Sequence, residues 1–139
     1  MELMTNGVQT VEANESLQFQ TALSAGSSSI MWRVGSGIIT LRGIGPQLRA
    51  RFRVSYYGNV ALSAGAEVAP IEVAILVSGE GISSSRSIST PAAAEEFNNV
   101  AASTFIDVPA GCCVNITVGN IGTTSVDFEN LNLIVERVA

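Results

Sequence analysis

Apolar and polar side chains alternate along much of this chain with a period of two, which is typical of β-strands. The pattern is clearest in residues 104–118, where an alternating strand, a Pro-Ala-Gly turn at 109–111 and a second alternating strand follow one another. Ile106 and Val108 fall on the side opposite Phe105. Alternation bounded by proline and glycine predicts two antiparallel strands with one buried face.

The same alternation recurs at short intervals, as it does in β-sandwiches and barrels. Helical spacing is weak, and only residues 90–97 could form a helical turn. We therefore expect an all-β fold, an antiparallel jelly-roll sandwich of about eight to ten strands. The expected strands are residues 7–11, 16–23, 29–34, 37–42, 47–57, 71–77, 82–90, 104–109, 114–118 and 126–138.

Two of these strands carry rows of large apolar side chains that must be buried. Each row either fills the core of one subunit or lines an axis between subunits, and the alternation leaves both open. The rows comprise Phe52, Val54, Tyr56, Leu131 and Leu133.

Composition adds an expectation of self-association. Of the 139 residues, 47% are hydrophobic and only 14% are charged, whereas ordinary domains carry about 25% charged residues. A chain so poor in charge covers apolar surface most simply by binding copies of itself. Residues 1–20 precede the clearest strands and are predicted to form an N-terminal arm or first strand, with attachment as its role, and residues 21–139 the jelly-roll domain.

Charge, residue content and the length of apolar runs argue against several classes of function. The net charge is −5 and there is no histidine, so we expect no nucleic-acid partner and no histidine-based catalysis. No apolar run reaches the roughly 20 residues of a membrane helix, and the N-terminus lacks the pattern of a signal peptide. We expect a protein that is not an enzyme, holds no cofactor or metal, and does not insert into membranes.

The main charge cluster is Arg49, Arg51 and Arg53 on one side of a predicted strand. These arginines either pair across the sheet with acids such as Glu72 or Glu136, or dock an acidic partner surface. Arginine suits docking because its planar guanidinium grips carboxylates with two hydrogen bonds.

Trp32 and Tyr57 are candidates for an interface or a sugar-stacking surface, with plain packing as the alternative. The neighbouring Cys112 and Cys113 should face opposite sides of a strand. We expect one thiol in the core and one at a surface or subunit interface, with an intersubunit disulfide as the alternative. Glu95 and Glu96 lie in a loop but lack the acidic spacing of a calcium site.

The order of these signals resembles the trimeric jelly-roll heads of the tumour necrosis factor and complement-head superfamily, and within it the bacterial and phage branch. The resembling stretches include Ile75-Leu-Val-Ser-Gly79 and Val108-Pro-Ala-Gly-Cys-Cys-Val114, in which Cys112 stands where an acid is common. Leu133-Ile-Val-Glu-Arg137 resembles the usual last strand. The chain also resembles small open reading frames of phages that infect gut Firmicutes.

The resemblance implies a homotrimeric, non-enzymatic virion protein that decorates a capsid or forms part of a head fibre. Its partners would then be its own copies and capsid or other virion proteins. It would be made in the bacterial cytoplasm without a signal peptide and end in the phage particle. The alternative is a trimeric adhesin head that binds a glycan or receptor on a cell surface or at a tail tip.

Overall fold

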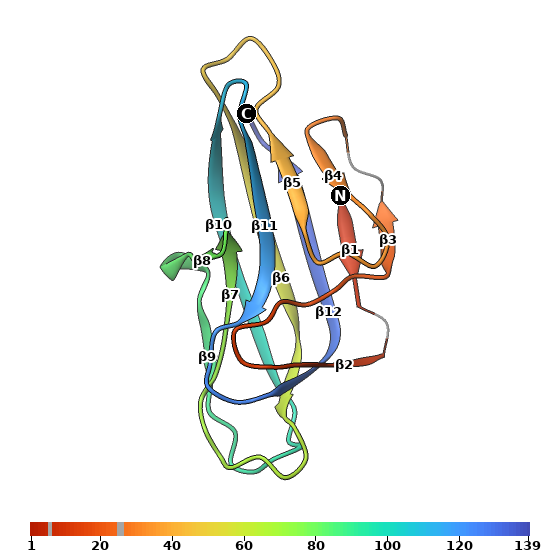
Figure 1. Ribbon diagram of the computed structural model, residues 1–139, viewed down its shortest axis with the longest axis vertical. Coiled ribbons are helices and arrows are strands. Elements are labelled where there is room, and N and C mark those ends of the chain that lie inside the picture. The colour runs from red at the N-terminus through yellow and green to blue at the C-terminus, as the bar shows by residue number, and fades with distance from the viewer. Residues whose placement is uncertain (6, 25–26) are drawn as a thin grey trace.

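The computed structural model describes residues 1–5, 7–24 and 27–139, which form a sandwich of two antiparallel sheets (Figure 1). The first sheet, sheet A, has the strand order β10-β6-β12-β1-β3, and β2 also pairs with β12. Its strands are β1 (Glu2–Met4), β2 (Val8–Val11), β3 (Thr21–Ser24), β6 (Arg49–Leu62), β10 (Asn98–Pro109) and β12 (Val126–Arg137).

The second sheet, sheet B, has the order β4-β5-β11-β7-β8, and β9 also pairs with β7. Its strands are β4 (Ile30–Trp32), β5 (Ile39–Arg42), β7 (Ile71–Val77), β8 (Glu80–Gly81), β9 (Ser87–Ser89) and β11 (Cys113–Asn120). A short 3-10 turn, η1 (Ser83–Ser85), precedes β9. The all-β sandwich expected from the alternation is thus confirmed. The described residues form more strands than predicted, and β6, β10 and β11 are longer than their predicted ranges.

The core lies between the two sheets and is filled by the inward row of each long strand. The five residues that could have lined either the core or a subunit axis are all core residues, at most 1% exposed: Phe52, Val54, Tyr56, Leu131 and Leu133. A contact along a threefold axis must therefore use other side chains.

Residues 1–5 and 7–20 are part of this sandwich. The β1 strand pairs with β12 through Leu3 and Leu133, and Leu17 and Phe19 are buried in the core. The predicted first strand is present as β2. The proposed boundary at residue 20 does not separate two structural units, because side chains on both sides of it fill one core.

Two predicted strands are shorter than expected for a local reason. In residues 16–23 only β3 is a strand, because the backbone at Leu17 and Phe19 bonds to Val118 and Ser36 while it crosses from one sheet to the other. In residues 82–90 the Ser85 hydroxyl bonds to the backbone of Ile75 and Ile82 and holds the η1 turn. Residues 90–97 form bends and turns and no helix.

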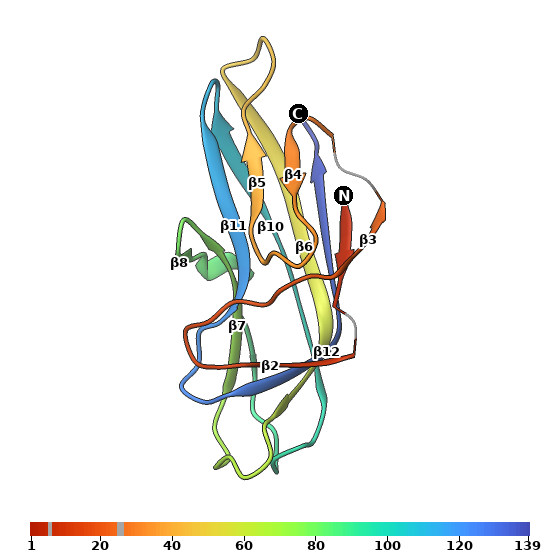
Figure 2. The same ribbon diagram turned by 45° about the vertical axis from the view of Figure 1, so that its right-hand side comes forward.

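The long strands run from one end of the sandwich to the other, as Figure 2 shows. We call the apex the end that carries the β5–β6 loop (43–48) and the β10–β11 turn (110–112). We call the base the opposite end, with loops 63–70 and 90–97. Among the described residues, no helix has the length and apolar character needed to cross a bilayer.

Candidate functional site: the outer face of sheet A and the apex

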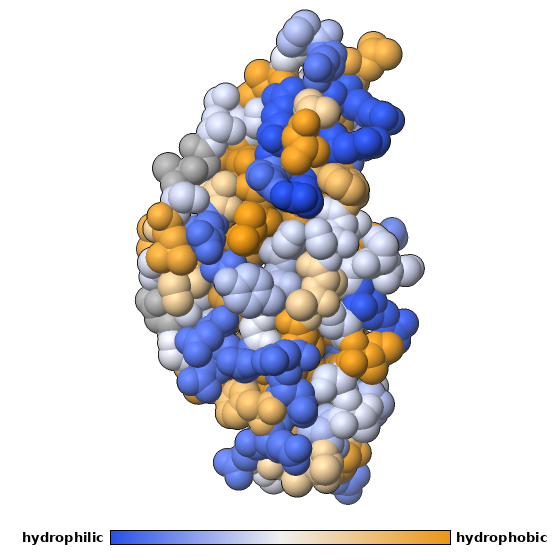
Figure 3. All heavy atoms as spheres, turned by 180° about the vertical axis from the view of Figure 1, so that it is seen from behind, coloured by the Kyte–Doolittle hydropathy of each residue, from blue (hydrophilic) through white to orange (hydrophobic). Residues whose placement is uncertain are grey.

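Alternation along β6 places every second side chain on the outer face of sheet A. Arg49, Arg51, Arg53, Ser55 and Tyr57 point outward while the residues between them are buried. Figure 3 shows this face from outside, with the most hydrophilic residues gathered toward the apex and paler residues across its middle.

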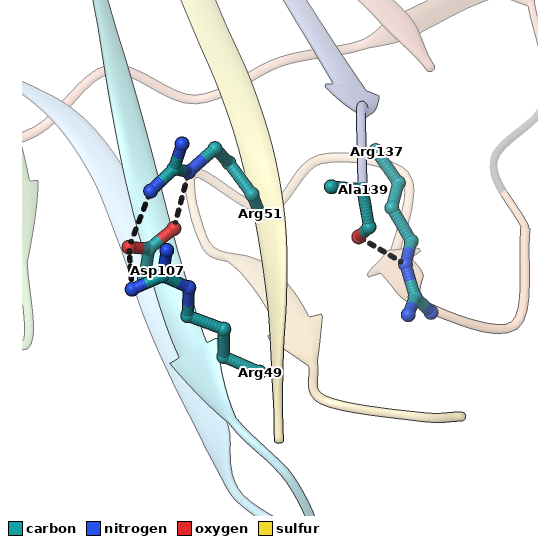
Figure 4. A network of polar contacts seen from close by, with 5 residues as sticks. All are labelled: Arg49, Arg51, Asp107, Arg137 and Ala139. Carbon is teal, nitrogen blue, oxygen red and sulfur yellow. Dashed lines mark hydrogen bonds and ion pairs between the residues drawn. The ribbon is translucent and has the colours of Figure 1, made fainter. Parts of the chain in front are cut away.

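The three arginines are paired across the sheet, as one of the two hypotheses predicted. Arg51 donates two hydrogen bonds to the Asp107 carboxylate, at 2.8 and 3.1 Å, and Arg49 lies 3.4 Å from the same group. Figure 4 shows both guanidinium groups reaching from β6 to Asp107 on β10. Arg53 pairs with Glu136, as expected, whereas Glu72 pairs with Arg86.

This ion-pair cluster shifts the titration of its members. Hydrogen bonding from Arg51, assisted by the charge of Arg49, lowers the pKa of Asp107 below its usual value. The same carboxylate raises the pKa of Arg51. Asp107 therefore stays ionised into more acidic solution than an isolated aspartate does.

A hollow of about 830 Å³ opens at the apex beside these ion pairs. Arg49, Arg51 and Asp107 form its charged side, while Leu48 and two prolines form its apolar side. Leu48 is 92% exposed, an unusual position for a leucine. The hollow is lined by Pro46, Gln47, Leu48, Arg49, Arg51, Asp107, Pro109 and Ala139.

Of the two aromatic candidates, only Tyr57 presents its ring to solvent. Tyr57 is 53% exposed on the outer face of sheet A. It borders a second hollow, of about 420 Å³, with Asn59, Asn99 and Asn130. Trp32 is half-buried against the core, and its indole N–H donates to the Ser36 carbonyl at 2.8 Å.

The expectation of one core thiol is wrong, because Cys112 and Cys113 are both exposed and free. Cys112 lies in the turn, where its amide donates to the Pro109 carbonyl, so it does not follow the alternation of a strand. Cys113 opens β11 on the solvent side, opposite the buried Ile116 row. Whether either thiol lies between subunits stays a prediction.

Two members of the site were missed by sequence reasoning. Asp107 was not singled out as a partner of the arginines, although its register opposite Arg51 could have been sought from the pairing of the two strands. Leu48 gave no signal, because an apolar residue at the end of an expected strand usually faces the core. No group of three His, Cys, Asp or Glu residues that could hold a metal ion occurs in the described ranges.

No protein-family model matches the chain, and no curated protein matches it in sequence. Among solved structures, the globular domain of the zebrafish complement 1qA protein superposes with a TM-score of 0.58, over 96% of this chain and 93% of that one, at 6% identity. The CBM22-1 xylan-binding domain of Xyn10C from Paenibacillus barcinonensis aligns over 99% of this chain and 87% of that one, at 14% identity. The TM-score of this second superposition is 0.37.

The chain therefore has the jelly-roll fold of the complement-head and tumour necrosis factor-like domains, and the expected fold class is confirmed. At 6% identity this likeness shows the fold alone.

Proposed function

We propose that this chain is a non-enzymatic head that associates with copies of itself into a homotrimer through the middle of the outer face of sheet A, around Phe105 and Tyr57, and that the apical end at Arg49 stays exposed. The observation that carries the proposal is that the polar groups of this face are largely satisfied within the face. Arg51 and Arg53 are neutralised by Asp107 and Glu136, and the hydroxyls of Ser55 and Ser103 bond to each other at 2.8 Å. Burying paired groups costs much less than burying free ones.

The same face exposes the apolar area that an interface requires. Phe105 is 60% exposed and lies beside Arg53 in register, and Tyr57 lies beside Ala101. Aromatic residues are enriched at the centres of protein interfaces.

The subunit number of three is supported by the resemblance of the sequence to trimeric heads. The absence of histidine from the chain supports a role without catalysis. We assign the trimer to a phage particle, as a capsid decoration or a head-fibre component. Support for this last part comes from the sequence resemblance alone.

Light scattering on the purified protein tests the trimer. We expect three times the monomer mass, and Tyr57→Glu should shift the mass toward the monomer because it places a charge at the buried centre. Met31→Glu is the matched control, since Met31 on β4 of sheet B is 51% exposed and Tyr57 is 53% exposed. A monomeric wild-type protein would overturn the trimer. Co-sedimentation with phage particles tests the virion assignment separately, and failure to bind any particle would remove it.

A second candidate function, a glycan-binding head, is favoured by the hollow beside Tyr57. One aromatic ring and the amides of Asn59, Asn99 and Asn130 line it, and rings with nearby amide groups suit sugar faces and hydroxyls. The hollow lies on the face that a trimer would cover, so the two functions exclude each other at this position. Binding on a glycan array that Tyr57→Ala abolishes, by a protein of monomer mass, would establish this second function.

A further inference from the structure

The charged residues of the chain are separated along its long axis. Strand register places five of the seven arginines toward the apex, where Asp107 and Glu136 are their acidic partners. These arginines are Arg42, Arg49, Arg51, Arg53 and Arg137. The base loops 63–70 and 90–97 contribute Glu67, Glu95 and Glu96 and no arginine. An acidic protein thus presents a cationic end.

The apical hollow is held in shape by its own backbone. The Ala110 amide donates to the Leu48 carbonyl at 2.9 Å, and Gly43 exchanges hydrogen bonds with the turn at Gly111 and Cys112, at 3.0 and 2.9 Å. Arg137 donates to the Ile44 carbonyl and to the Ser29 hydroxyl. A site fixed in this way loses little conformational entropy when a ligand binds.

Arg49 is the member of the cluster best placed to accept a new partner. Arg51 already donates two hydrogen bonds to the Asp107 carboxylate, and Arg137 already donates to the Ile44 carbonyl of the β5–β6 loop. Arg49 makes a single 3.4 Å contact with a carboxylate that it shares, and its side chain is 61% exposed. Its guanidinium therefore keeps most of its donors for an incoming anion.

We propose that the apical hollow docks an acidic peptide segment of a partner protein, with a carboxylate on Arg49 and an adjacent apolar side chain against Leu48. The two prolines beside Leu48 extend the apolar wall. This mixture of a guanidinium and an aliphatic wall favours a peptide over an acidic saccharide, which would find no exposed aromatic ring among the lining residues. The inference rests on the proposed head function, because it names the surface by which the head would attach.

An acetylated and amidated peptide of alternating glutamate and leucine tests the site, with a glutamine–leucine peptide as its uncharged counterpart. We expect the acidic peptide to bind in fluorescence anisotropy, more weakly as salt rises, and the uncharged one not to bind. Arg49→Ala should weaken binding about tenfold or more, as loss of a charge-assisted hydrogen bond does. Arg49→Lys should fall between, because it keeps the charge but loses the planar fork.

Asp107→Asn gives the opposite expectation. It releases Arg49 and Arg51 from their shared carboxylate, so acidic peptide should bind a few times more tightly. A purely structural role for Asp107 could not produce this gain. Arg33→Ala is the matched control, since it removes an exposed arginine in the β4–β5 connection, outside the hollow.

Several results would overturn the inference. If Arg33→Ala and Arg49→Ala weaken peptide binding equally, the binding depends on the net charge of the protein and not on the apical hollow. A sulfated saccharide that binds more tightly than the peptide, and that Leu48→Ala leaves unaffected, would replace the peptide as ligand. Apex-to-base association between copies, abolished by Arg49→Ala and by Glu96→Gln, would make the chain its own partner. If the protein is a trimer but binds no acidic peptide, only this inference is overturned. If the protein is a monomer that binds the peptide, only the proposed trimer is overturned.

Discussion

The buried Tyr56 phenol joins three parts of the sandwich. Its hydroxyl lies 2.6 Å from the Ser85 carbonyl and 3.0 Å from that of Val73, so a sheet A residue holds β7 and the η1 turn. Burial raises the pKa of this phenol. The group therefore remains a neutral donor throughout the physiological range.

Tyr56→Phe should lower the free energy of unfolding by about 1–2 kcal/mol, because it leaves buried carbonyl groups without their donor. Urea denaturation followed by fluorescence measures the change. Tyr57→Phe is the control: the same hydroxyl is removed from an exposed ring one position along the strand. Equal effects of the two substitutions would contradict the role assigned to the Tyr56 hydroxyl.

The exposure of Cys112 and Cys113 also makes a residue-scale prediction. Both thiols should react with an aromatic disulfide reagent in the folded protein, without denaturant, because both side chains are exposed. Cys112→Ser and Cys113→Ser should each reduce the reactive count by one. A folded protein with a single reactive thiol would restore the prediction of a buried cysteine made from the alternation.

The Asp107 pair makes stability depend on pH. Because the pKa of Asp107 is lower in the folded chain, its stabilisation is complete above the ordinary aspartate pKa of about 3.9 and is lost as pH falls through the lower folded value. The unfolding midpoints of the wild type and Asp107→Asn should differ at neutral pH and converge below about pH 4. Glu67→Gln, in an exposed loop, is the control. A difference that does not shrink as the pH falls below the ordinary aspartate pKa would show that charge is not its cause.

At the scale of elements, the apical loops depend on one close backbone approach. A Cβ atom at Gly43 would lie 2.2 Å from the Pro109 carbonyl oxygen, so the β5–β6 loop can cross the β10–β11 turn only with glycine there. Gly43→Ala should cost about 1–3 kcal/mol of unfolding free energy, as overpacking does, and it should disturb the apical hollow. Gly81→Ala, with its nearest contact at 3.8 Å, should change thermal stability little.

Two elements were predicted with bounds close to those observed. Residues 71–77 are β7 as predicted, and residues 126–138 contain β12 with Leu131, Leu133 and Val135 buried. Residues 16–23 were predicted as a strand because Leu17 and Phe19 alternate with polar residues. Both side chains are buried as the period requires, but the Leu17 amide bonds to Val118 of β11 and the Phe19 backbone bonds to residues 35 and 36 in the β4–β5 connection. Alternation in the sequence therefore predicts which side chains are buried, but it does not predict which backbone segments form strand hydrogen bonds.

The candidate site was less predictable, because it depends on register. The arginines on β6 and the pairing of Arg53 with Glu136 could be expected from the two strands. The hollow requires the loop before β6, the turn after β10 and the residues after β12 to meet at one end. No local pattern in any of the three segments indicates the other two.

At the scale of the whole molecule, β12 is central to sheet A. It pairs with β6 on one side and with β1 and β2 on the other. A chain that ends before Val126 would lack the strand that joins the β10–β6 pair to the β1–β3 pair, and it would lose the buried Phe128, Leu131, Leu133 and Val135 from the core. We expect such a truncation to remain unfolded by circular dichroism. A short glycine–serine insertion in loop 63–70 should be tolerated, since it interrupts no strand.

Synthesis of the protein is affected by the place of β12 in the chain. Its residues are translated more than sixty positions after those of β6, so a growing chain on the ribosome holds β6 with one long edge open until translation has passed residue 137. Unpaired edges recruit other strands, and pairing across such separations is slow. Crowded polysomes making this protein would therefore carry many open edges at once, and its yield should respond to translation rate and to chaperones that cover nascent strands.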